Sequence, residues 1–387
     1  MSTHTSSIIR GTAQMAAIVP YLLDYRPDDS LVVIGARVDP DCAVGQASIG
    51  MSLRVDLPQV EHLDGFAHYL LAPLTRSAEG VPLLVHAFVY DDRDEAQHED
   101  EAARDARCYL LMEAFAARLD DEPNVPFHAF GVIRGQEVAV LWNGGEPVDG
   151  AWDGTRIPAK AWVPLPPGAE VPAAADLVLQ GRNPQRRRSD VVSQVRRRDE
   201  ELSAAADLCL SMTDLKPERF DLMASVRQLG RWVVLDEGEP THRERAEMAL
   251  AVQEALVRDL FLGRWLPDLF PMHDHDFPAE LAEVGRELPR LGGGLGKGAV
   301  PGSSDEAAAR VAVDRLLTLA SGVPEDYTPP LLTLAACLSW GRGEGTLANE
   351  AVDLALEIDP GYRMALLLRH VLIAGISPRS WAKKVAA

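Results

Sequence analysis

The sequence lacks the apolar runs that would carry it into or across a membrane. In its 387 residues, no stretch approaches the ~18 consecutive apolar residues that a membrane-spanning helix needs. The polar start, from Met1 to Ser7, is followed by no apolar segment that would complete a secretory signal. These features predict a cytoplasmic protein without membrane association.

Cysteine is scarce, and the chain has no Cys-x-x-Cys pair. The four residues are far apart in the sequence: Cys42, Cys108, Cys209 and Cys337. This spacing argues against a zinc ribbon and against a dense disulfide framework. We expect four reduced, buried thiols.

Basic residues are fewer than acidic ones. The chain has 38 lysines and arginines and 58 aspartates and glutamates, which gives a formal charge of −20. Nucleic acids and anionic membranes bind through cationic surfaces, which a net-acidic protein does not favour. The charge balance therefore favours solubility and, among partners, basic ones.

Local signatures of catalysis are also missing. The sequence has no Gly-x-Ser-x-Gly elbow, and no Gly-x-Gly-x-x-Gly follows its first expected strand. Gly292–Gly298 is one residue too short for a phosphate loop, and no Ser or Thr follows Lys297. His273–Asp276 has metal-compatible residue types, but it lies between Pro271 and Pro278 in an expected surface loop. We therefore predict no cofactor and no metal, and we favour a non-catalytic protein, although dispersed catalytic residues converge only in the fold.

The N-terminal part, residues 1–142, alternates between strand and helix patterns. Thr12 is expected to cap a helix that Pro20 bends or ends, and Arg134–Gly135 is expected to form a two-residue hairpin turn. The expected strands are Leu31–Gly35 and 44–57, which are able to form a hairpin, then Leu83–Tyr90, 127–133 and 136–142; the expected helices are 60–76 and 98–121. This pattern predicts an α/β domain with a mixed sheet under helical cover.

A change of composition follows at residues 143–175, which are rich in glycine and proline. Trp142, Trp152 and Trp162 recur there at ten-residue spacing, and tryptophan is too apolar to be left loose. We therefore expect a linker that packs on the sheet domain.

Residues 176–387 predict an all-helical domain. Thr241 and Glu244 form a capping-box pattern before a helix whose Ala249, Val252, Leu256 and Leu260 share one face. Ser303 is expected to cap a later helix after a glycine-rich break. Within 329–376, the segment Thr333–Pro360 looks like one tetratricopeptide-like hairpin, which serves either as an interaction surface or as a structural cap on the preceding helices.

Several stretches resemble one family. Val19–Gly35 (VPYLLDYRPDDSLVVIG) is similar to the opening of the actinobacterial domain of unknown function 4192 family, and Arg54–Pro58 fits its second strand. Further similarity is found at Gly181–Pro184, Arg188–Val191, Trp340–Gly345 and Ala355–Tyr362. The chain departs from the family at Asp24, where glycine is common, and in the long acidic insert after Tyr90. The family carries no established activity, so the resemblance implies a lineage and a cytoplasmic setting.

The turn before the first expected strand is the best small-molecule candidate. Arg26 has the chemistry to clamp an anion, with Asp28, Asp29 and Ser30 at the entrance to the strand. The alternative is structural: Pro27 shapes the turn, and Asp28 and Ser30 satisfy local backbone groups.

Two charged clusters are further candidates. Arginines crowd one short stretch: Arg182, Arg186, Arg187, Arg188, Arg196, Arg197 and Arg198. This stretch, with Ser189 as a helix cap, is either a docking site for phosphate, RNA or an acidic protein, or a solvated helix paired with nearby acids. The acidic run Asp91–Glu101 after a strand is either a cation or acid–base site or a hydrated loop.

Three functional hypotheses follow. The leading one is a non-catalytic interaction or scaffold protein that binds another protein through its helical half, with Trp340 among the binding residues. The second is an enzyme or sensor for an anionic small molecule at Arg26, with Arg182 reaching over from the helical half. The third, disfavoured by charge and by the lack of interleaved aromatic residues, is nucleic-acid association through the Arg186–Arg198 stripe.

Overall fold

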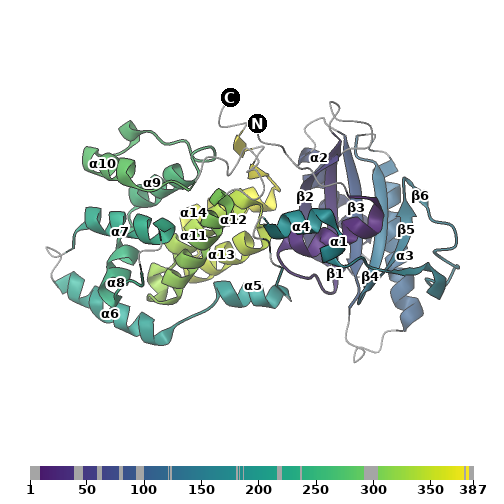
Figure 1. Cartoon of the computed structure of the whole chain (residues 1–387), viewed down its shortest axis with the longest axis horizontal. Coiled ribbons are helices and arrows are strands. Elements are labelled where there is room, and N and C mark those ends of the chain that lie inside the picture. The colour runs from purple at the N-terminus through teal and green to yellow at the C-terminus, as the bar shows by residue number, and fades with distance from the viewer. Residues whose placement is uncertain are drawn as a thin grey trace. The chain divides into compact units, whose positions relative to one another are not determined.

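The structure, a computed structural model, divides the chain into two compact units, Met1–Arg188 and Ser189–Ala387, called here the sheet unit and the helical unit (Figure 1). It describes residues 9–38, 47–58, 63–77, 82–92, 100–120, 122, 124–179, 182, 184–185, 187–215, 220–235, 238–291, 304–378 and 381–382. An α/β first half and a largely helical second half are both present, as the sequence predicts.

The sheet unit is built on a mixed, seven-stranded sheet. Its strand order is β2-β1-β3-β4-β5-β6, with β7 also paired to β5. Only β3 and β4 pair in parallel among these strands; the other pairs are antiparallel. The strands are β1 (Ser30–Val38), β2 (Ala47–Asp56), β3 (Leu83–Tyr90), β4 (Phe127–Arg134), β5 (Glu137–Asn143), β6 (Glu146–Pro147) and β7 (Trp162–Pro164).

Both expected hairpins are present, one of them shifted by a residue. The β1–β2 hairpin is confirmed, with Ser30 opposite Asp56 at its open end. Between β4 and β5, Arg134 pairs with Glu137, so the two-residue turn is Gly135–Gln136 rather than Arg134–Gly135. Gly135 has a φ of 56°, a left-handed backbone that glycine adopts without steric cost.

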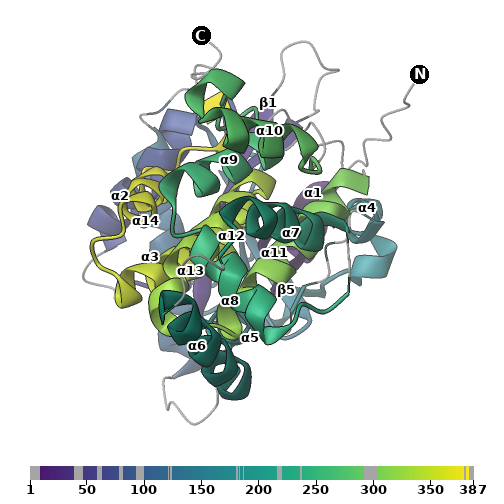
Figure 2. The same cartoon turned by 90° about the vertical axis from the view of Figure 1, so that its left-hand side faces the viewer.

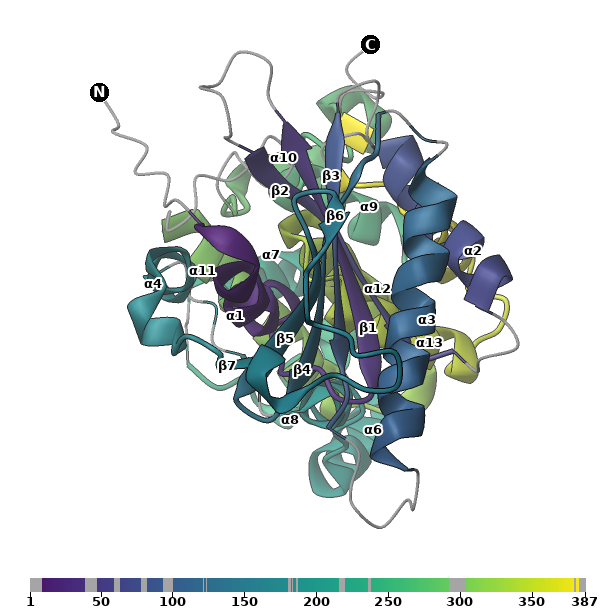
Figure 3. The ribbon, with the colours of Figure 1, turned by 90° about the vertical axis from the view of Figure 1, so that its right-hand side faces the viewer.

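Helices cover both faces of the sheet. Figure 3 shows α2 (Leu63–Ser77) and α3 (Glu101–Asp120) on one face, called the α3 side, and α1 (Gly11–Leu23) and α4 (Pro172–Leu179) on the other, called the α1 side. A separate buried apolar cluster fills each interface. Because β3 is buried on both faces and paired on both edges, its sequence is a nearly continuous apolar run, as the sequence analysis expects for an inner strand.

The first helix differs from its prediction at both ends. Thr12 is not its cap: the N-cap is Arg10, and the Thr12 hydroxyl instead donates to Asn143 Oδ1 at 2.9 Å. Pro20 lies inside the helix, which continues to Leu23. It ends at Asp24, whose φ of 63° is left-handed. A local pattern favoured Thr12 as a cap, but a partner more than a hundred residues away in the chain takes its hydroxyl.

The glycine- and proline-rich segment after β5 carries ordered structure. It contains β6, β7 and two short 3-10 turns, η2 (Ala159–Ala161) and η3 (Gly168–Glu170). The Trp152 ring stacks on Tyr109 at a centroid distance of 4.6 Å, and the Trp142 indole donates to Phe127 O at 3.2 Å. Domain boundaries at residues 142 and 175 stay predictions.

The helices of the helical unit, shown in Figure 2, pack around one large apolar core. This core includes the stacked rings of Phe261 and Trp265. At its centre α12 buries residues on every side. Of the helices that the structure describes, none is both long and apolar enough to cross a membrane. The helices are α5 (Arg188–Val195), α6 (Glu200–Leu215), α7 (Leu222–Leu235), α8 (His242–Ala251), α9 (Ala255–Trp265), α10 (Ala279–Glu287), α11 (Ser304–Ser321), α12 (Pro329–Arg342), α13 (Gly345–Ile358) and α14 (Arg363–Ile373), with short turns η5 (Asp274–Asp276) and η6 (Glu325–Tyr327).

Helix starts in this unit were predicted with mixed success. The capping box of Thr241 and Glu244 is confirmed at the start of α8. The single apolar face expected beyond it is wrong, because α8 ends at Ala251, a new helix begins at Ala255, and Leu256 is exposed. The predicted cap at Ser303 lies outside the described residues.

Replacing Thr241 by alanine should lower the free energy of unfolding of the helical unit by about 1 kcal/mol. The Thr241 hydroxyl accepts from Glu244 N at 3.3 Å, and Thr241 N donates to Glu244 Oε2 at 2.7 Å, so the substitution removes half of a reciprocal cap. Hydrogen exchange of the first turn of α8 measures the loss. Thr241→Ser, which keeps the hydroxyl, should exchange as the parent does; equal acceleration in both variants would refute the cap's contribution.

Candidate functional site

Charged side chains gather where β3 and β4 end together, an edge called here the carboxyl edge. In open α/β sheets, ligands bind at the carboxyl ends of parallel strands. Asp91 and Asp92 directly follow β3, and Gly135 follows β4. Because β1 runs antiparallel to β3, the segment Tyr25–Asp29 that precedes β1 reaches the same edge.

Asp91 is the centre of a buried ionic network on this edge. Its side chain is fully buried and meets three guanidinium groups. Arg134 Nη2 lies 2.7 Å from Asp91 Oδ2, Arg104 Nη2 lies 3.0 Å from the same oxygen, and Arg107 Nη2 lies 3.6 Å from Oδ1. Arg104 also donates to the Asp91 carbonyl at 2.7 Å. The network fastens α3 and β4 to the end of β3.

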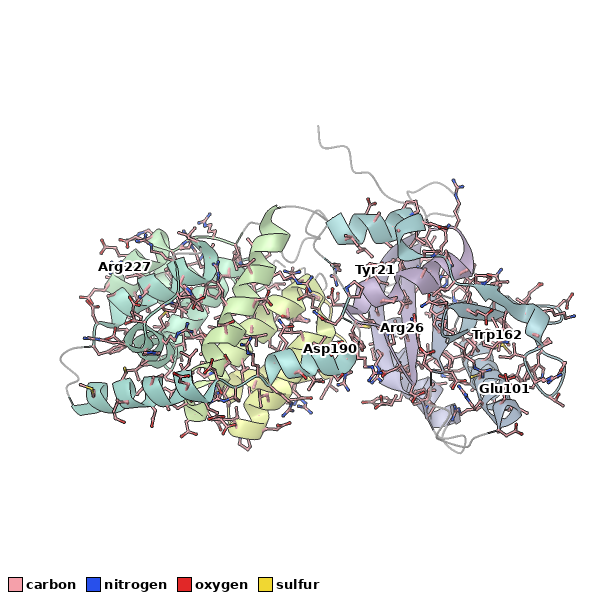
Figure 4. The ribbon with its side chains drawn as sticks, turned by 60° about the horizontal axis from the view of Figure 1, so that its bottom comes forward. Tyr21, Arg26, Glu101, Trp162, Asp190 and Arg227 are labelled. Atoms are coloured by element: carbon pink, nitrogen blue, oxygen red, sulfur yellow. The ribbon has the colours of Figure 1, made fainter. Side chains whose placement is uncertain are left out.

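The network extends through Arg134 to the start of α3 and to β7. Arg134 Nη2 lies 2.7 Å from Asp105 Oδ1, and the other oxygen of Asp105 accepts from Ile157 N at 2.8 Å. The Arg134 guanidinium lies 5.0 Å from the centroid of the Trp162 ring, which is labelled in Figure 4 together with Glu101 at the start of α3. Burial disfavours the charge of Arg134, but the neighbouring carboxylates outweigh it and raise its pKa.

This network was missed in the sequence. The run Asp91–Glu101 was expected to be either a cation or acid–base site or a hydrated loop. Residues 93–99 lie outside the described residues, but the burial of Asp91 contradicts the hydrated loop for its first member. The available signal was the pair Arg104 and Arg107, one helical turn apart in the helix that follows. Because each arginine of the network lies beside a carboxylate, the network has the character of a structural ion cluster.

Cys108 lies beside this network and is fully buried. Burial raises the pKa of its thiol to about 12, with the nearby Asp91 charge adding to the effect. A thiol with such a pKa is protonated at neutral pH and is a poor nucleophile.

Arg26, the predicted anion clamp, is engaged by groups of the sheet unit. Its Nη2 lies 3.3 Å from Asp92 Oδ2 and donates to Gly135 O at 2.5 Å, while Gly135 N donates to Asp92 Oδ1 at 2.7 Å. These contacts join the segment before β1 to the β4–β5 turn. The side chain remains about a third exposed (36%).

Arg182 is brought close to this segment, within the sheet unit. Arg182 Nη1 donates to Asp24 Oδ2 at 3.0 Å. Gln185 N donates to Asp24 O at 2.7 Å, and Arg26 N donates to Gln185 O at 3.0 Å, so the chain after α4 is tied alongside Arg26.

The other predicted residues of the turn have different surroundings. Asp28 is exposed, and its carbonyl accepts from Arg54 Nη2 at 3.4 Å. Asp29 has a φ of 37°; with Asp24, it is one of two non-glycine residues in the described part of the chain with a left-handed backbone. Ser30 is fully buried, and its Oγ has no hydrogen-bond partner among the described residues. Left-handed non-glycine residues and orphaned buried polar atoms are each unusual, and this segment has both.

The predicted arginine stripe is only partly described, because Arg186 lies outside the described residues. Arg196 makes two hydrogen bonds to Glu357, at 2.7 and 2.6 Å, and Arg198 donates to Ala320 O and Val323 O. Arg197 is exposed. The expected cap Ser189 instead lies inside α5, which begins at Arg188. Two arginines of the stripe therefore bind the helical unit itself.

The histidine–aspartate segment before α10 uses its polar groups locally. His273 and His275 stack, Asp274 pairs with Arg286 at 2.7 Å, and Asp276 accepts from His273 N at 2.7 Å. No group of three or more His, Cys, Asp or Glu in the described ranges is placed to hold a metal ion. Gly292–Gly298 lies outside those ranges.

Trp340 is buried rather than displayed. Its ring is edge-on to Trp381 at 6.4 Å, and its indole donates to Ile376 O at 3.1 Å. Trp381 in turn donates to Leu269 O at 2.9 Å. Trp340 thus anchors the segment after α14.

An apolar surface that the sequence analysis did not single out lies on α14. Leu366, Leu367 and Ile373 are exposed by 38%, 54% and 59%. Arg363 and His370, also exposed, lie on the same helical face, because all five follow a spacing of three or four residues. The signal in the sequence was a short helix with more large apolar residues than one buried face accommodates.

Comparison with known proteins adds a family. A model of the family described as "Domain of unknown function (DUF4192)" matches residues 13–290 and 297–379. No curated protein and no solved structure matches the chain. Since the matched residues span nearly the whole sequence, including the segment before β1 and the helices through α14, the chain belongs to the DUF4192 family.

Proposed function

We propose that this chain is a non-catalytic protein-interaction protein whose helical unit binds a helix of a partner protein on the outer face of α14. The carrying observation is the set of exposed Leu366, Leu367 and Ile373 on one side of that helix. Exposed apolar side chains that gather on one face mark interaction sites more often than singly scattered ones do.

A tetratricopeptide-like arrangement of the last helices would account for this open face, and two features support it. α12 and α13 are joined by a two-residue turn in which Gly343 has a φ of 82°, and they pack closely together. α14 begins at Arg363, 34 positions after the start of α12 at Pro329, which is the tetratricopeptide period. In this proposal α14 corresponds to the first helix of a second unit, and the second helix of that unit would lie on its exposed face.

The partner that fits this face is an amphipathic helix. Its apolar residues would recur at i, i+3 or i+4, and i+7, so that they pack between Leu366, Leu367 and Ile373 as one helix packs on another. The exposed Arg363 on this face favours a partner helix whose polar side carries acidic residues, because opposite charge speeds encounter and suppresses wrong partners.

The test is affinity capture from the native cell extract with the full chain and two matched variants. Leu367→Asp places a charge in the α14 face, and Leu208→Asp places one on α6, where the leucine is also well exposed (66%). We expect one protein to co-purify in stoichiometric amount with the parent and with Leu208→Asp, and to be lost with Leu367→Asp. Hydrogen exchange of the purified complex should then show new protection in α14.

Two results would contradict the proposal. One is a partner retained equally by both variants, which would place the binding surface elsewhere. The other is the absence of any stoichiometric partner, combined with sedimentation that shows self-association broken by Leu367→Asp. The α14 face would then be a contact between copies of this chain.

A further inference from the structure

We propose that the carboxyl edge of the sheet also binds a small carboxylate, held on the α1 side between Ser30 and Arg54. This site is separate from the α14 face and lies within the sheet unit. Neither residue belongs to the Asp91 network, and Arg54 was not among the residues predicted from the sequence to bind a ligand.

One edge of the Arg54 guanidinium group, Nε and Nη2, makes only one long hydrogen bond to the described residues. Nη1 pairs with Asp56 Oδ1 at 2.5 Å, and Nη2 makes only a long contact, 3.4 Å, with Asp28 O. Nε is buried and has no hydrogen-bond partner among the described residues. The Nε and Nη2 groups form the side of an arginine that binds a carboxylate through two parallel hydrogen bonds.

Ser30 supplies a second orphaned donor beside it. In the β1–β2 register Ser30 lies opposite Asp56, and Val32 lies opposite Arg54. Directly opposed residues share a face, so Ser30 and Arg54 are diagonal neighbours on the α1 side, within reach of one another's long side chains. The Ser30 side chain is fully buried, and its Oγ is unpaired. The Arg54 Nε–H and the Ser30 hydroxyl are thus two buried donors without partners among the described residues, and a bound hydrogen-bond acceptor would satisfy both.

The backbone beside this patch has one unusual conformation. Asp29, which directly precedes Ser30, has a φ of 37°, whereas the left-handed φ of Asp24 belongs to the C-cap of α1. Non-glycine residues in this conformation persist where the surrounding structure demands it, and they cluster at ligand clamps.

The local charge selects a monoanion. Arg26 is already matched by Asp92, and Asp56 adds a negative charge beside Arg54. One guanidinium with a planar two-donor edge suits a carboxylate group, and the surrounding acids disfavour a doubly charged phosphate. The ligand class is therefore a small organic carboxylate.

The experiment follows the Arg54 Nε–H resonance of the full chain by NMR while acetate, and separately inorganic phosphate, is added. We expect acetate to shift this resonance saturably and phosphate to have little effect. Arg54→Lys keeps the charge but removes the fork, and should weaken acetate binding at least tenfold; Ser30→Ala should weaken it about fivefold, the loss of one hydrogen bond. Arg37→Lys, at the other end of β1, is the control and should leave binding unchanged.

Stability of the ligand-free variants separates a binding role from a structural one. If Ser30 Oγ is unpaired without ligand, Ser30→Ala should keep or raise the midpoint of thermal unfolding while it weakens acetate binding. A lowered midpoint would show that the hydroxyl already has a partner and would overturn the proposal. So would an Arg54 Nε resonance that ignores acetate, or one that responds more strongly to phosphate.

Discussion

Replacing Asp91 by alanine is expected to lower the free energy of unfolding of the sheet unit by about 3–5 kcal/mol. The substitution removes the carboxylate that lies among Arg104, Arg107 and Arg134, and it leaves their positive charges beside one another. Arg134 keeps Asp105, whereas Arg104 and Arg107 lose the carboxylate that they share. Hydrogen exchange of β3 and α3, measured in the full chain, reports the stability of this unit separately from the helical unit.

Asp92 provides the matched control for Asp91. It is the next residue in the chain and also pairs with an arginine, but its side chain is 23% exposed and that of Arg26 is 36% exposed. Solvent screens such a pair, so Asp92→Ala should cost about 1 kcal/mol or less. Equal losses for the two variants would show that burial of the Asp91 network contributes nothing special. Asp91→Asn, which keeps the shape and two hydrogen-bonding groups, should fall between them.

Acidification from pH about 6.5 to about 4 is expected to remove about 3 kcal/mol of stability from the sheet unit through His86 alone. His86 lies on β3, buried on the α1 side and edge-on to His128 at a centroid distance of 5.0 Å. Burial, with the nearby His128 as a lesser cause, lowers the pKa of His86 from 6.5 to about 4. Burial also lowers the pKa of His128, which adds to the effect.

The direction of this dependence follows from which state binds the proton more tightly. In the unfolded chain His86 titrates near its ordinary pKa of 6.5, whereas in the folded protein it stays neutral until about pH 4. Between these values the unfolded state carries the extra proton, so stability is complete above pH about 6.5 and falls as the pH falls. Below about pH 4 both states are protonated, and His86 contributes no further loss.

Urea unfolding of the full chain at a series of pH values tests this dependence, with β3 exchange as the local readout. Carboxylates also titrate in this range, so the informative quantity is the difference between the parent and His86→Phe, which keeps an aromatic ring without a titrating group. That difference should grow by about 3 kcal/mol from pH 7 to 4. His242→Phe, at an exposed position at the start of α8, should follow the parent at every pH. A constant difference between His86→Phe and the parent would refute the linkage.

Much of the fold follows from patterns that act within a few residues. The run Leu83–Tyr90 is apolar throughout because it is covered on both faces, and that alone predicts an inner strand. The Thr241 and Glu244 pair caps its own helix three residues away, so its chemistry is complete in the local sequence. By contrast, β3 and β4 are connected through α3 and pair in parallel, and no local pattern specifies this neighbourhood.

The candidate sites depended on the tertiary structure for most of their content. Arg26 was singled out from its sequence context, but only the fold shows that Asp92 already holds it. In the sequence, Arg54 is notable only as part of an expected strand. Only the fold, in which β2 pairs with β1, shows that Nη2 makes a long contact with Asp28 O.

The sequence by itself determined the acidic character, the α/β-then-helical order and the family resemblance, since composition and short-range periodicity carry these. Only the tertiary structure decided that Asp91 is buried among three arginines, one of them 43 positions away, and that α14 keeps an open apolar face. The physical reason is the same in both cases. Burial and charge pairing depend on which distant segments the chain brings together, and a single sequence does not display those distances.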